Sequence, residues 1–401
     1  MEAQRQPKLV AKIAPSITIY QLLRTHLRDV ESAGFEILCV CDDDEWGQRL
    51  RDLGYRVAPV GMGRRPSPLA VLVWAMRLYR VLLRERPQVI HTTNAFHGLG
   101  ARAIGRVARV PVIAHTVHNW FYLQTGERGS VLFRFLERVG ARLGDVVFFV
   151  GTDDFEEARE KRIVSPSRSE YIGDGIDVEG FSAACEASNP REVRHAAGLG
   201  QDDIVVTMIA RAERPKNHRL FLEAFERVAA HEPRVQALLI GGGAGLPALE
   251  RLVAASACAG RVHLLGNRDD VAQLLSATDV LVLASAYEAF GRSVVEGMVA
   301  RVPVIGTNVK GLRQVIEHRR TGLLVEDGDV EALAQAIVDL IHDRELTRRL
   351  VAAAHTRALE LFDERDVSAR VCEAYERLLS RKDGRRSRGR PDEGHAARVA
   401  A

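Results

Sequence analysis

The chain has 401 residues, of which 46% are hydrophobic and 27% charged, so it is not a disordered polymer and is long enough for two domains with separate cores. Its 56 Lys and Arg nearly balance its 53 Asp and Glu, and the net charge of +3 argues against a nucleic-acid partner. The five cysteines include no C-x-x-C pair and are too sparse for a disulfide framework, which favours a reducing compartment.

Short β-branched runs alternate with segments of helical period, the pattern of parallel sheets covered by helices on both faces. The strands expected in a first sheet are 9–14, 36–41, 55–60, 89–94, 112–118 and 145–151. The strands expected in a second sheet are 204–210, 235–243, 262–266, 280–285, 302–308 and 321–326. The predicted fold class is α/β, with two Rossmann-like, doubly wound parallel-sheet domains facing one another across a cleft.

A change of composition marks the expected domain boundary. Residues 172–194 are rich in Gly, Asp, Ser and Pro, and we interpret them as a linker. The N-terminal domain is predicted to cover 1–182 and the C-terminal domain 190–363, with a helix at 366–380 returning to the first domain. Residues 383–401 are basic, polar and Gly-rich, and they are predicted to form a disordered tail.

The most informative motif follows a predicted strand and precedes a predicted helix. Glu288, Phe290 and Gly291 lie in the loop, and the helix is expected to begin near Ser293 with Glu296 in its first turn. A helix N-terminus can hold a diphosphate through its N–H groups and partial positive charge, and glycine allows close approach of the ligand. The two carboxylates can accept hydrogen bonds from sugar hydroxyls on either side. This combination indicates a nucleotide-sugar site.

The same residues also have a structural explanation, because Ser293-Val-Val-Glu296 matches a capping box and Glu288 could be an ordinary solvated acid. A second segment favours the ligand. Arg211 and Lys216 follow the predicted strand at 204–210. Fixed cations at a strand end would stabilise the negative charge of a departing nucleoside diphosphate.

These residues resemble the retaining glycosyltransferases of family 4, the glycosyl transferases group 1, which have the GT-B architecture. The E-A-F-G-x-x-x-x-E block at Glu288 and Glu296 is similar to the E-x7-E motif of that family, and Arg211 with Lys216 matches its R-x4-K pair. Further similarity covers most of residues 204–345, and weaker similarity is found in the first half.

The resemblance implies a role for each matched residue. Arg211 and Lys216 would hold the donor diphosphate, Glu288 the donor sugar and Glu296 the ribose. The N-terminal domain would bind the acceptor and the C-terminal domain the nucleotide sugar. His118, from the N-terminal domain, would reach the donor sugar or the reaction centre. The backbone expected to cradle sugar and phosphate lies at Phe290, Gly291 and Ser293. The turn expected to border the base is Gly266, Asn267 and Arg268.

The resemblance also implies the reaction. A hexose-type sugar would leave a nucleotide donor, UDP by family habit, with retained configuration and with no covalent intermediate on a carboxylate. We expect no metal and no cofactor besides the donor substrate. A D-x-D pattern in CDDDEW (41–46) is like that of metal-dependent GT-A transferases, but it follows the second strand of a two-domain pattern, so we expect a solvated loop. NAD chemistry is disfavoured, since no G-x-G-x-x-G spacing occurs in the glycine-rich segments.

The evidence on the acceptor is a local concentration of positive charge. Residues 60–142 contain 13 arginines, no lysine and three acids. Within them, 68–87 joins an apolar stretch to four arginines, so it either sits on an anionic membrane or forms a core helix with arginines on its wet side. The resemblance favours a lipid-linked acceptor, a polyprenyl phosphate or phosphoglycolipid, with peripheral contact through 64–142. Residues 1–14 lack a signal-peptide apolar region, so the predicted location is cytoplasmic.

Several departures from the family pattern keep rival functions open. Ala210 and Lys310 replace frequent glycines, Gln314 replaces a frequent Glu, and 14–21 lacks the usual glycine-rich loop. The rivals are a transferase acting on a soluble secondary metabolite, a nucleotide-sugar epimerase or sugar phosphorylase, and a non-catalytic subunit that binds a sugar nucleotide.

Overall fold

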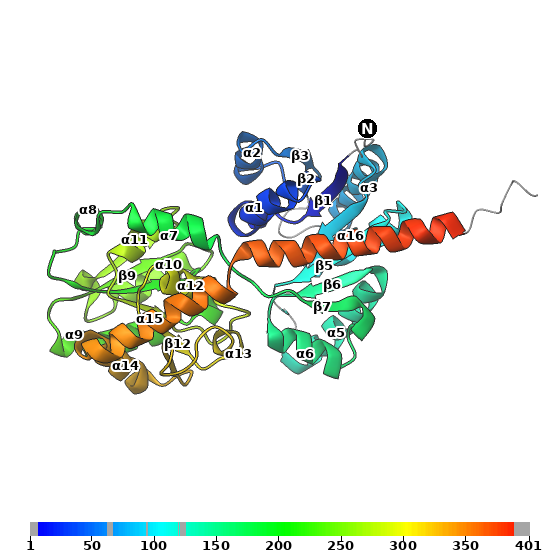
Figure 1. The fold of residues 1–401 in the computed structure, drawn as a ribbon. Helices are drawn as coiled ribbons and strands as arrows, with labels where there is room; N and C mark the ends of the chain where they lie inside the picture. The colour runs from blue at the N-terminus through cyan, green and yellow to red at the C-terminus, as the bar shows by residue number, and fades with distance from the viewer. Residues whose placement is uncertain (1–6, 62–66, 94, 119, 121–125, 389–401) are drawn as a thin grey trace, which may run out of the picture. The chain divides into compact units, whose positions relative to one another are not determined.

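The computed structural model describes residues 7–61, 67–93, 95–118, 120 and 126–388. The chain divides into two compact units, whose elements are labelled in Figure 1. Unit 1 comprises 1–150, 154–172 and 365–401, and unit 2 comprises 151–153 and 173–364. Each unit is built on one parallel sheet with helices on its faces, which confirms the predicted α/β class of two Rossmann-like domains.

The sheet of unit 1 has the strand order β3-β2-β1-β4-β5-β6-β7, and every pairing is parallel. Its strands are β1 (Lys8–Ile13), β2 (Phe35–Cys41), β3 (Arg56–Pro59), β4 (Val89–Thr92), β5 (Val112–Val117), β6 (Val146–Phe149) and β7 (Ser169–Tyr171). Its helices are α1 (Ser16–Ser32), α2 (Glu45–Asp52), α3 (Pro68–Glu85), α4 (Ala95–Val107), α5 (Gly126–Leu143), α6 (Thr152–Glu160) and α16 (Glu364–Arg388). The order reverses direction between β1 and β4, as in doubly wound folds.

Alternate residues of the unit 1 strands pack against two helix layers. Val10 of β1 belongs to a buried cluster with Tyr375 of α16, whereas the next residue, Ala11, belongs to a cluster with Trp74 of α3. This alternation is the two-residue period of a strand buried on both faces. Helices α1 and α16 therefore cover one face, and α3 and α4 cover the other.

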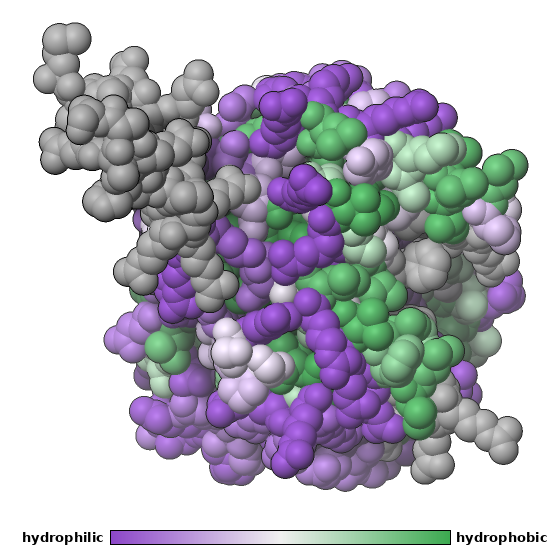
Figure 2. Space-filling model, turned by 90° about the vertical axis from the view of Figure 1, so that its right-hand side faces the viewer, coloured by the Kyte–Doolittle hydropathy of each residue, from purple (hydrophilic) through white to green (hydrophobic). Residues whose placement is uncertain are grey.

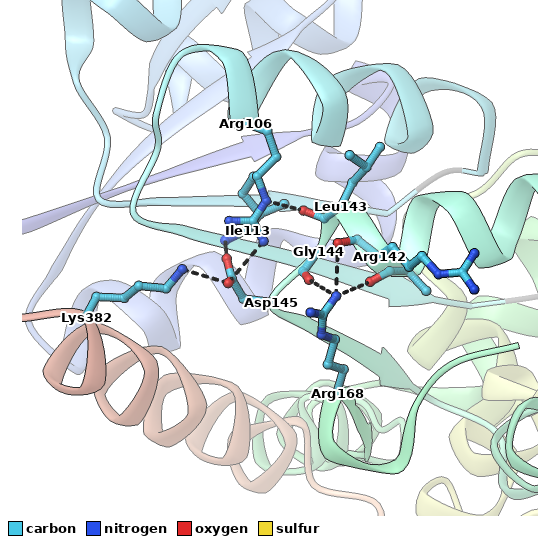
Figure 3. A network of polar contacts seen from close by, with 9 residues as sticks. Arg106, Ile113, Arg142, Leu143, Gly144, Asp145, Arg168 and Lys382 are labelled. Atoms are coloured by element: carbon cyan, nitrogen blue, oxygen red, sulfur yellow. Dashed lines mark hydrogen bonds and ion pairs between the residues drawn. The ribbon is translucent and has the colours of Figure 1, made fainter. Parts of the chain in front are cut away.

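A polar network holds the far end of α16 to this sheet (Figure 3). The Asp145 carboxylate accepts from the Ile113 amide at 2.9 Å and pairs with Arg106 at 3.1 Å and Lys382 at 2.8 Å. Arg168 donates to three carbonyl oxygens of the adjacent turn. The return helix predicted at 366–380 is thus anchored beyond its expected end. It continues to Arg388, into the segment predicted to be disordered.

The segment interpreted as a linker contains two helices, α7 (Val178–Glu186) and α8 (Pro190–Ala196). Asp177 caps α7 by accepting from the Gly180 amide at 3.0 Å, and Asn189 caps α8. Val178 is buried in a core cluster of unit 2. Residues 173–182 therefore lie in unit 2, not in the first domain where the composition had placed them.

The CDDDEW segment also has a local structural role. Asp44 is the N-cap of α2, where its side chain accepts from the Gly47 amide at 2.9 Å. The Ser16 hydroxyl donates to the other oxygen of this carboxylate at 2.8 Å. Asp44 therefore starts a helix.

The sheet of unit 2 has the order β10-β9-β8-β11-β12-β13, again parallel throughout. Its strands are β8 (Ile204–Ile209), β9 (Val235–Ile240), β10 (Val262–Gly266), β11 (Val280–Leu283), β12 (Val304–Thr307) and β13 (Leu323–Val325). Its remaining helices are α9 (His218–His231), α10 (Leu246–Ala254), α11 (Val271–Ser276), α12 (Arg292–Val299), α13 (Lys310–Arg313), α14 (Val330–His342) and α15 (Arg344–Leu361). Because the strands are parallel, the loops that follow them share one edge of the sheet, where ligands of such folds bind.

Across the described part of the chain, every helix is too short or too polar to cross a bilayer.

Candidate functional site

Two loops that carry predicted site residues are joined at the carboxyl edge of the unit 2 sheet. Strands β8 and β11 are neighbours in this sheet, so the loops that follow them begin side by side. The Ala286 amide donates to the Pro215 carbonyl oxygen at 2.9 Å and ties one loop to the other. The short 3-10 helix η3 (Arg214–Lys216) completes the first loop before α9.

Lys216 and Glu288 meet at this junction. Lys216 Nζ lies 2.5 Å from Glu288 Oε1, and the side chains are only 19% and 9% exposed. The Ser285 hydroxyl donates to the same carboxylate oxygen at 2.7 Å. The structure therefore brings the predicted diphosphate cation and the predicted sugar-binding carboxylate into direct, largely buried contact.

Arg211 lies on the same loop but makes a different contact. Its guanidinium pairs with Glu213 at 2.9 Å, and its side chain is 69% exposed. The long side chain is at the surface, at the carboxyl end of β8. Of the two predicted cations, Lys216 is therefore the one whose ammonium group the fold fixes beside Glu288.

The start of α12 excludes the capping-box explanation of Ser293 and Glu296. The N-cap residue is Gly291, and no side chain caps the helix, so Ser293 lies inside the first turn. Gly291 has a φ of 95°, and a Cβ there would lie 2.4 Å from Leu312 Cδ2. Glycine is required for both reasons. The helix N-terminus and its amides therefore stand at the site without a side-chain cap.

Phe290 and Glu296 differ in what they offer a ligand. The Phe290 ring is buried and packs edge-on against Phe362, with ring centroids 5.4 Å apart, so only its backbone is suited to the predicted role. Glu296 lies within α12, where burial raises the pKa of its carboxyl group and the nearby Arg292 opposes that shift. Arg292 itself pairs with Asp174 at 3.0 Å.

The predicted base-bordering turn follows β10, at the edge of the same sheet. Gly266 has a φ of 62°, and its carbonyl accepts from the Gly241 amide at 2.8 Å. The Asn267 side chain accepts from the Gly242 amide at 2.7 Å, while Arg268 pairs with Asp270. Asn267 therefore ties the loop after β9 to the loop after β10, and β9 separates this turn from Arg211 and Lys216.

His118 belongs to unit 1, immediately after β5, and it is half-buried. All the other predicted site residues belong to unit 2. The role predicted for His118 stays a prediction.

Three residues that the sequence did not assign to the site hold the Glu288 loop. Ser285 bonds to the carboxylate, and the Ser285 carbonyl accepts from the Thr307 hydroxyl at 2.5 Å. Gln314 Nε2 donates to the Ala289 carbonyl oxygen at 2.6 Å. The position of Ser285, three residues before Glu288 at a strand end, is a signal that could have identified it.

The charged groups at this edge suit a ligand that carries both anionic and hydroxyl groups. Lys216 and Arg211 supply positive charge, and Glu288 supplies a hydrogen-bond acceptor. Burial lowers the pKa of His218 to about 4, so this histidine adds no positive charge at neutral pH. In the described part of the chain, no group of three or more His, Cys, Asp or Glu is placed to hold a metal ion.

Two Rossmann-like parallel-sheet units are the architecture of GT-B glycosyltransferases, and comparisons with known proteins give the same class. Residues 190–357 match the family model described as glycosyl transferases group 1. Residues 23–175 match the model described as glycosyl transferase 4-like domain. The chain belongs to the glycosyl transferases group 1, and its predicted placement in family 4 with GT-B architecture is confirmed.

Individual relatives differ in the substrates that their names give. Over 273 residues the chain is 27% identical to UDP-Gal:alpha-D-GlcNAc-diphosphoundecaprenol alpha-1,3-galactosyltransferase of Escherichia coli, covering 67% of this chain and 70% of the relative. It is 28% identical to N-acetyl-alpha-D-glucosaminyl L-malate synthase of Bacillus anthracis, covering 78% of this chain and 81% of the relative. The fold is similar to Anabaena HepE, crystallised with UDP and glucose, with a TM-score of 0.77 at 19% identity over 92% of this chain and 99% of that one.

Proposed function

We propose that the chain transfers a hexose-type sugar from a UDP donor to a hydroxyl or phosphate of a lipid-linked acceptor, with retained configuration and without a metal ion or other cofactor. The observation that carries the donor side is the contact between Lys216 and Glu288. It sets a cation and a carboxylate side by side at the edge of a doubly wound sheet where nucleotides bind. A sugar joined to a diphosphate is complementary to this pair, because its phosphates can accept from the Lys216 ammonium group and its hydroxyls can donate to the Glu288 carboxylate.

Donor binding would redistribute the contacts of these residues. Lys216 and Arg211 would donate to the diphosphate, and Glu288 would accept from sugar hydroxyls. Glu288 stays oriented during this exchange, because the Ser285 hydroxyl holds the same carboxylate. Glu296 would accept from the ribose. The backbone of Phe290, Gly291 and Ser293 would face sugar and phosphate, and Gly266, Asn267 and Arg268 would border the base.

The chemistry that we propose needs positioning and charge stabilisation. The anomeric carbon–oxygen bond breaks, the sugar passes through an oxocarbenium-like state, and the acceptor oxygen enters on the face that the diphosphate leaves. The diphosphate takes the acceptor proton. Lys216 and Arg211 stabilise the negative charge that develops on the leaving group, in a site where Lys216 is largely shielded from water. His118 would contribute from unit 1.

A lipid-linked acceptor is supported by the diphosphoundecaprenol in the name of the Escherichia coli relative and by the basic stretch 64–142. The enzyme would then work at the cytoplasmic face of the inner membrane as a peripheral protein. A soluble acceptor is the second candidate, because the name of the Bacillus anthracis relative contains L-malate.

The proposal is tested in two stages. UDP-sugars and GDP-sugars are first screened for thermal stabilisation, where a ligand at 100 times its dissociation constant adds about 2.7 kcal/mol. UDP release is then measured with short-chain polyprenyl-phosphate acceptors, with soluble acceptors and without any acceptor, each with and without EDTA. We expect release that depends on the lipid acceptor and resists EDTA, and a product whose anomeric coupling in NMR matches the donor. Release with soluble acceptors alone would favour the second candidate, and EDTA inhibition would contradict the metal-free proposal.

A further inference from the structure

Helix α3 has a second apolar face, which points to solvent. On one side Trp74, Leu78 and Leu82 are at most 4% exposed and pack on the sheet. On the other side large apolar residues are strongly exposed: Leu69 (69%), Leu72 (56%), Met76 (46%), Tyr79 (36%) and Leu83 (46%). Their spacing of three and four residues keeps them in one stripe along the helix. Folding of unit 1 does not explain the exposed stripe, because the residues of the stripe do not enter the core of unit 1.

A row of arginines runs beside the stripe. Arg77, Arg80 and Arg84 are exposed and recur at the same helical spacing. The acidic residue of α3 is Glu85, and its carboxylate is paired with Arg56 at 2.5 Å and with Arg84 at 2.7 Å. The outer surface of α3 therefore combines apolar side chains with net positive charge.

Helix α5 carries a second group of exposed apolar residues, Val131 (60%), Leu132 (59%) and Phe135 (58%). Helix α4 contacts both α3 and α5, so the three helices form one layer on the sheet of unit 1. In Figure 2 hydrophobic side chains are grouped on one face of the molecule, with hydrophilic ones around and between them. We call the exposed stripe of α3, its arginine row and the α5 group the α3–α5 surface.

This surface reaches the edge of the sheet where an acceptor is expected. In a parallel α/β unit each helix begins near the carboxyl end of the preceding strand. Leu69 and Leu72 lie in the first turns of α3, and Val131 and Leu132 lie in the N-terminal half of α5. The apolar groups therefore begin near the carboxyl edge of the unit 1 sheet.

We propose that the α3–α5 surface docks unit 1 on an anionic lipid bilayer. The apolar side chains would enter the boundary between headgroups and acyl chains, and the arginine row would face anionic headgroups. The inference deepens the proposed function and rests on it, since it states how the enzyme reaches a lipid-linked acceptor.

Charge favours the bilayer over a second copy of this chain. A dimer built on two α3 stripes would bring Arg77, Arg80 and Arg84 close to the same row of the second copy, and like charges at an interface are unfavourable. An anionic bilayer satisfies both parts of the surface at once, because it offers an apolar interior beneath a negatively charged layer.

The first test removes the apolar stripe. The triple variant Leu72→Ser, Met76→Ser, Leu83→Ser is compared with the matched control Leu359→Ser, Leu361→Ser, which changes two exposed leucines at the end of α15 in unit 2. Binding is measured by flotation with vesicles of phosphatidylcholine containing about 30% phosphatidylglycerol, the anionic component that the arginines require. We expect the triple variant to bind at least about tenfold more weakly and the control to bind like the wild type.

The second test removes charge. The double variant Arg77→Gln, Arg80→Gln is compared with a control double variant, Arg348→Gln, Arg349→Gln, which changes two exposed arginines of α15 in unit 2. Each arginine near an anionic surface contributes about fivefold to binding, so loss of Arg77 and Arg80 should weaken vesicle binding about 25-fold, whereas loss of Arg348 and Arg349 should leave it unchanged. Wild-type protein should also bind poorly to vesicles of phosphatidylcholine alone.

The outcomes separate this inference from the proposed function. All variants are first shown to keep the wild-type melting temperature and UDP-sugar affinity. Wild-type protein that binds UDP-sugar but not anionic vesicles would overturn the docking surface and leave the transferase proposal standing. Vesicle binding without acceptor-dependent UDP release would overturn the transferase proposal and leave the docking surface standing. A dimer in sedimentation that the serine variant dissociates, with no vesicle binding, would assign the surface to a second copy.

Discussion

Replacing Lys216 by Met tests the donor site most directly. Methionine keeps the length of the side chain and removes the charge, so Glu288 loses an ammonium group at 2.5 Å but keeps the Ser285 hydroxyl at 2.7 Å. Loss of a charge-assisted contact in a largely buried position costs about 1.5 to 3 kcal/mol. If Lys216 makes such a contact with the diphosphate in the transition state, kcat/KM falls about 10- to 150-fold.

The assay is UDP release at saturating acceptor, together with calorimetric titration of UDP. Arg214→Ala is the matched control, because Arg214 is an exposed cation on the same short helix, two residues before Lys216. We expect Lys216→Met to weaken UDP binding and reduce kcat/KM, whereas Arg214→Ala leaves both within about twofold, since exposed charges contribute little.

Stability and function are separated in the same variant. Breaking the ion pair leaves a buried carboxylate, so the free energy of unfolding should also fall by about 1 to 3 kcal/mol in urea titrations. Glu288→Gln, Lys216→Met restores a neutral pair and should recover stability but not turnover. The reasoning is refuted if Lys216→Met keeps UDP affinity and kcat/KM near the wild type, or if the double variant recovers both.

Three further predictions follow from named contacts. Arg211→Ala should reduce kcat/KM for UDP release about tenfold, and unchanged kinetics would remove Arg211 from the diphosphate site. Gln314→Glu replaces the group that donates to the Ala289 carbonyl oxygen at 2.6 Å with a carboxylate that can only accept, so turnover should fall about tenfold. Gln314→Met removes the donor without adding a negative charge, so its turnover should fall less. Turnover equal to that of the wild type in Gln314→Glu would contradict the role of Gln314 in holding the Ala289 carbonyl. Burial lowers the pKa of Lys12 from 10.5 to about 7, so the folded chain binds fewer protons than the unfolded chain between these values. The free energy of unfolding should therefore rise as pH increases from about 7 toward 10, by several kcal/mol at most, and urea titrations of Lys12→Met should lack this rise.

Both sheets could be predicted from the sequence because long buried strands have a clear apolar signal. The prediction was wrong for short elements and for element ends, which depend on one to three residues. Strand β7 has three residues and no apolar run, and it was not predicted. The strand expected at 235–243 ends at Ile240, because Gly241 takes a φ of 136° that ends the extended backbone. The caps Asp177 and Asn189 start helices in a segment whose Gly, Ser and Pro content resembles a linker.

The proximity of Lys216 and Glu288 could be predicted, since neighbouring parallel strands end at the same edge. The contacts that hold Glu288 could not, because they join residues distant in the chain. Gln314 reaches Ala289 across 25 positions, and the sequence alone does not show which groups the loop after β12 will face. The capping-box explanation was wrong because the N-cap is Gly291, two residues before Ser293, and α12 begins at Arg292.

The positions that depart from the family pattern contribute to a well-ordered site. Gly311 is the glycine that the fold requires, because a Cβ there would lie 2.3 Å from the Glu288 carbonyl oxygen, whereas Lys310 beside it is exposed. Gln314 holds the Ala289 carbonyl, a contact for which a carboxylate at neutral pH has no donor. Ala210 keeps a backbone bond from its amide to the Ile240 carbonyl at 2.9 Å. These contacts keep the Glu288 loop ordered despite the departures at Ala210, Lys310 and Gln314. A transferase and a non-catalytic subunit that binds a sugar nucleotide would both need this order, so UDP release that depends on an acceptor is the measurement that separates them.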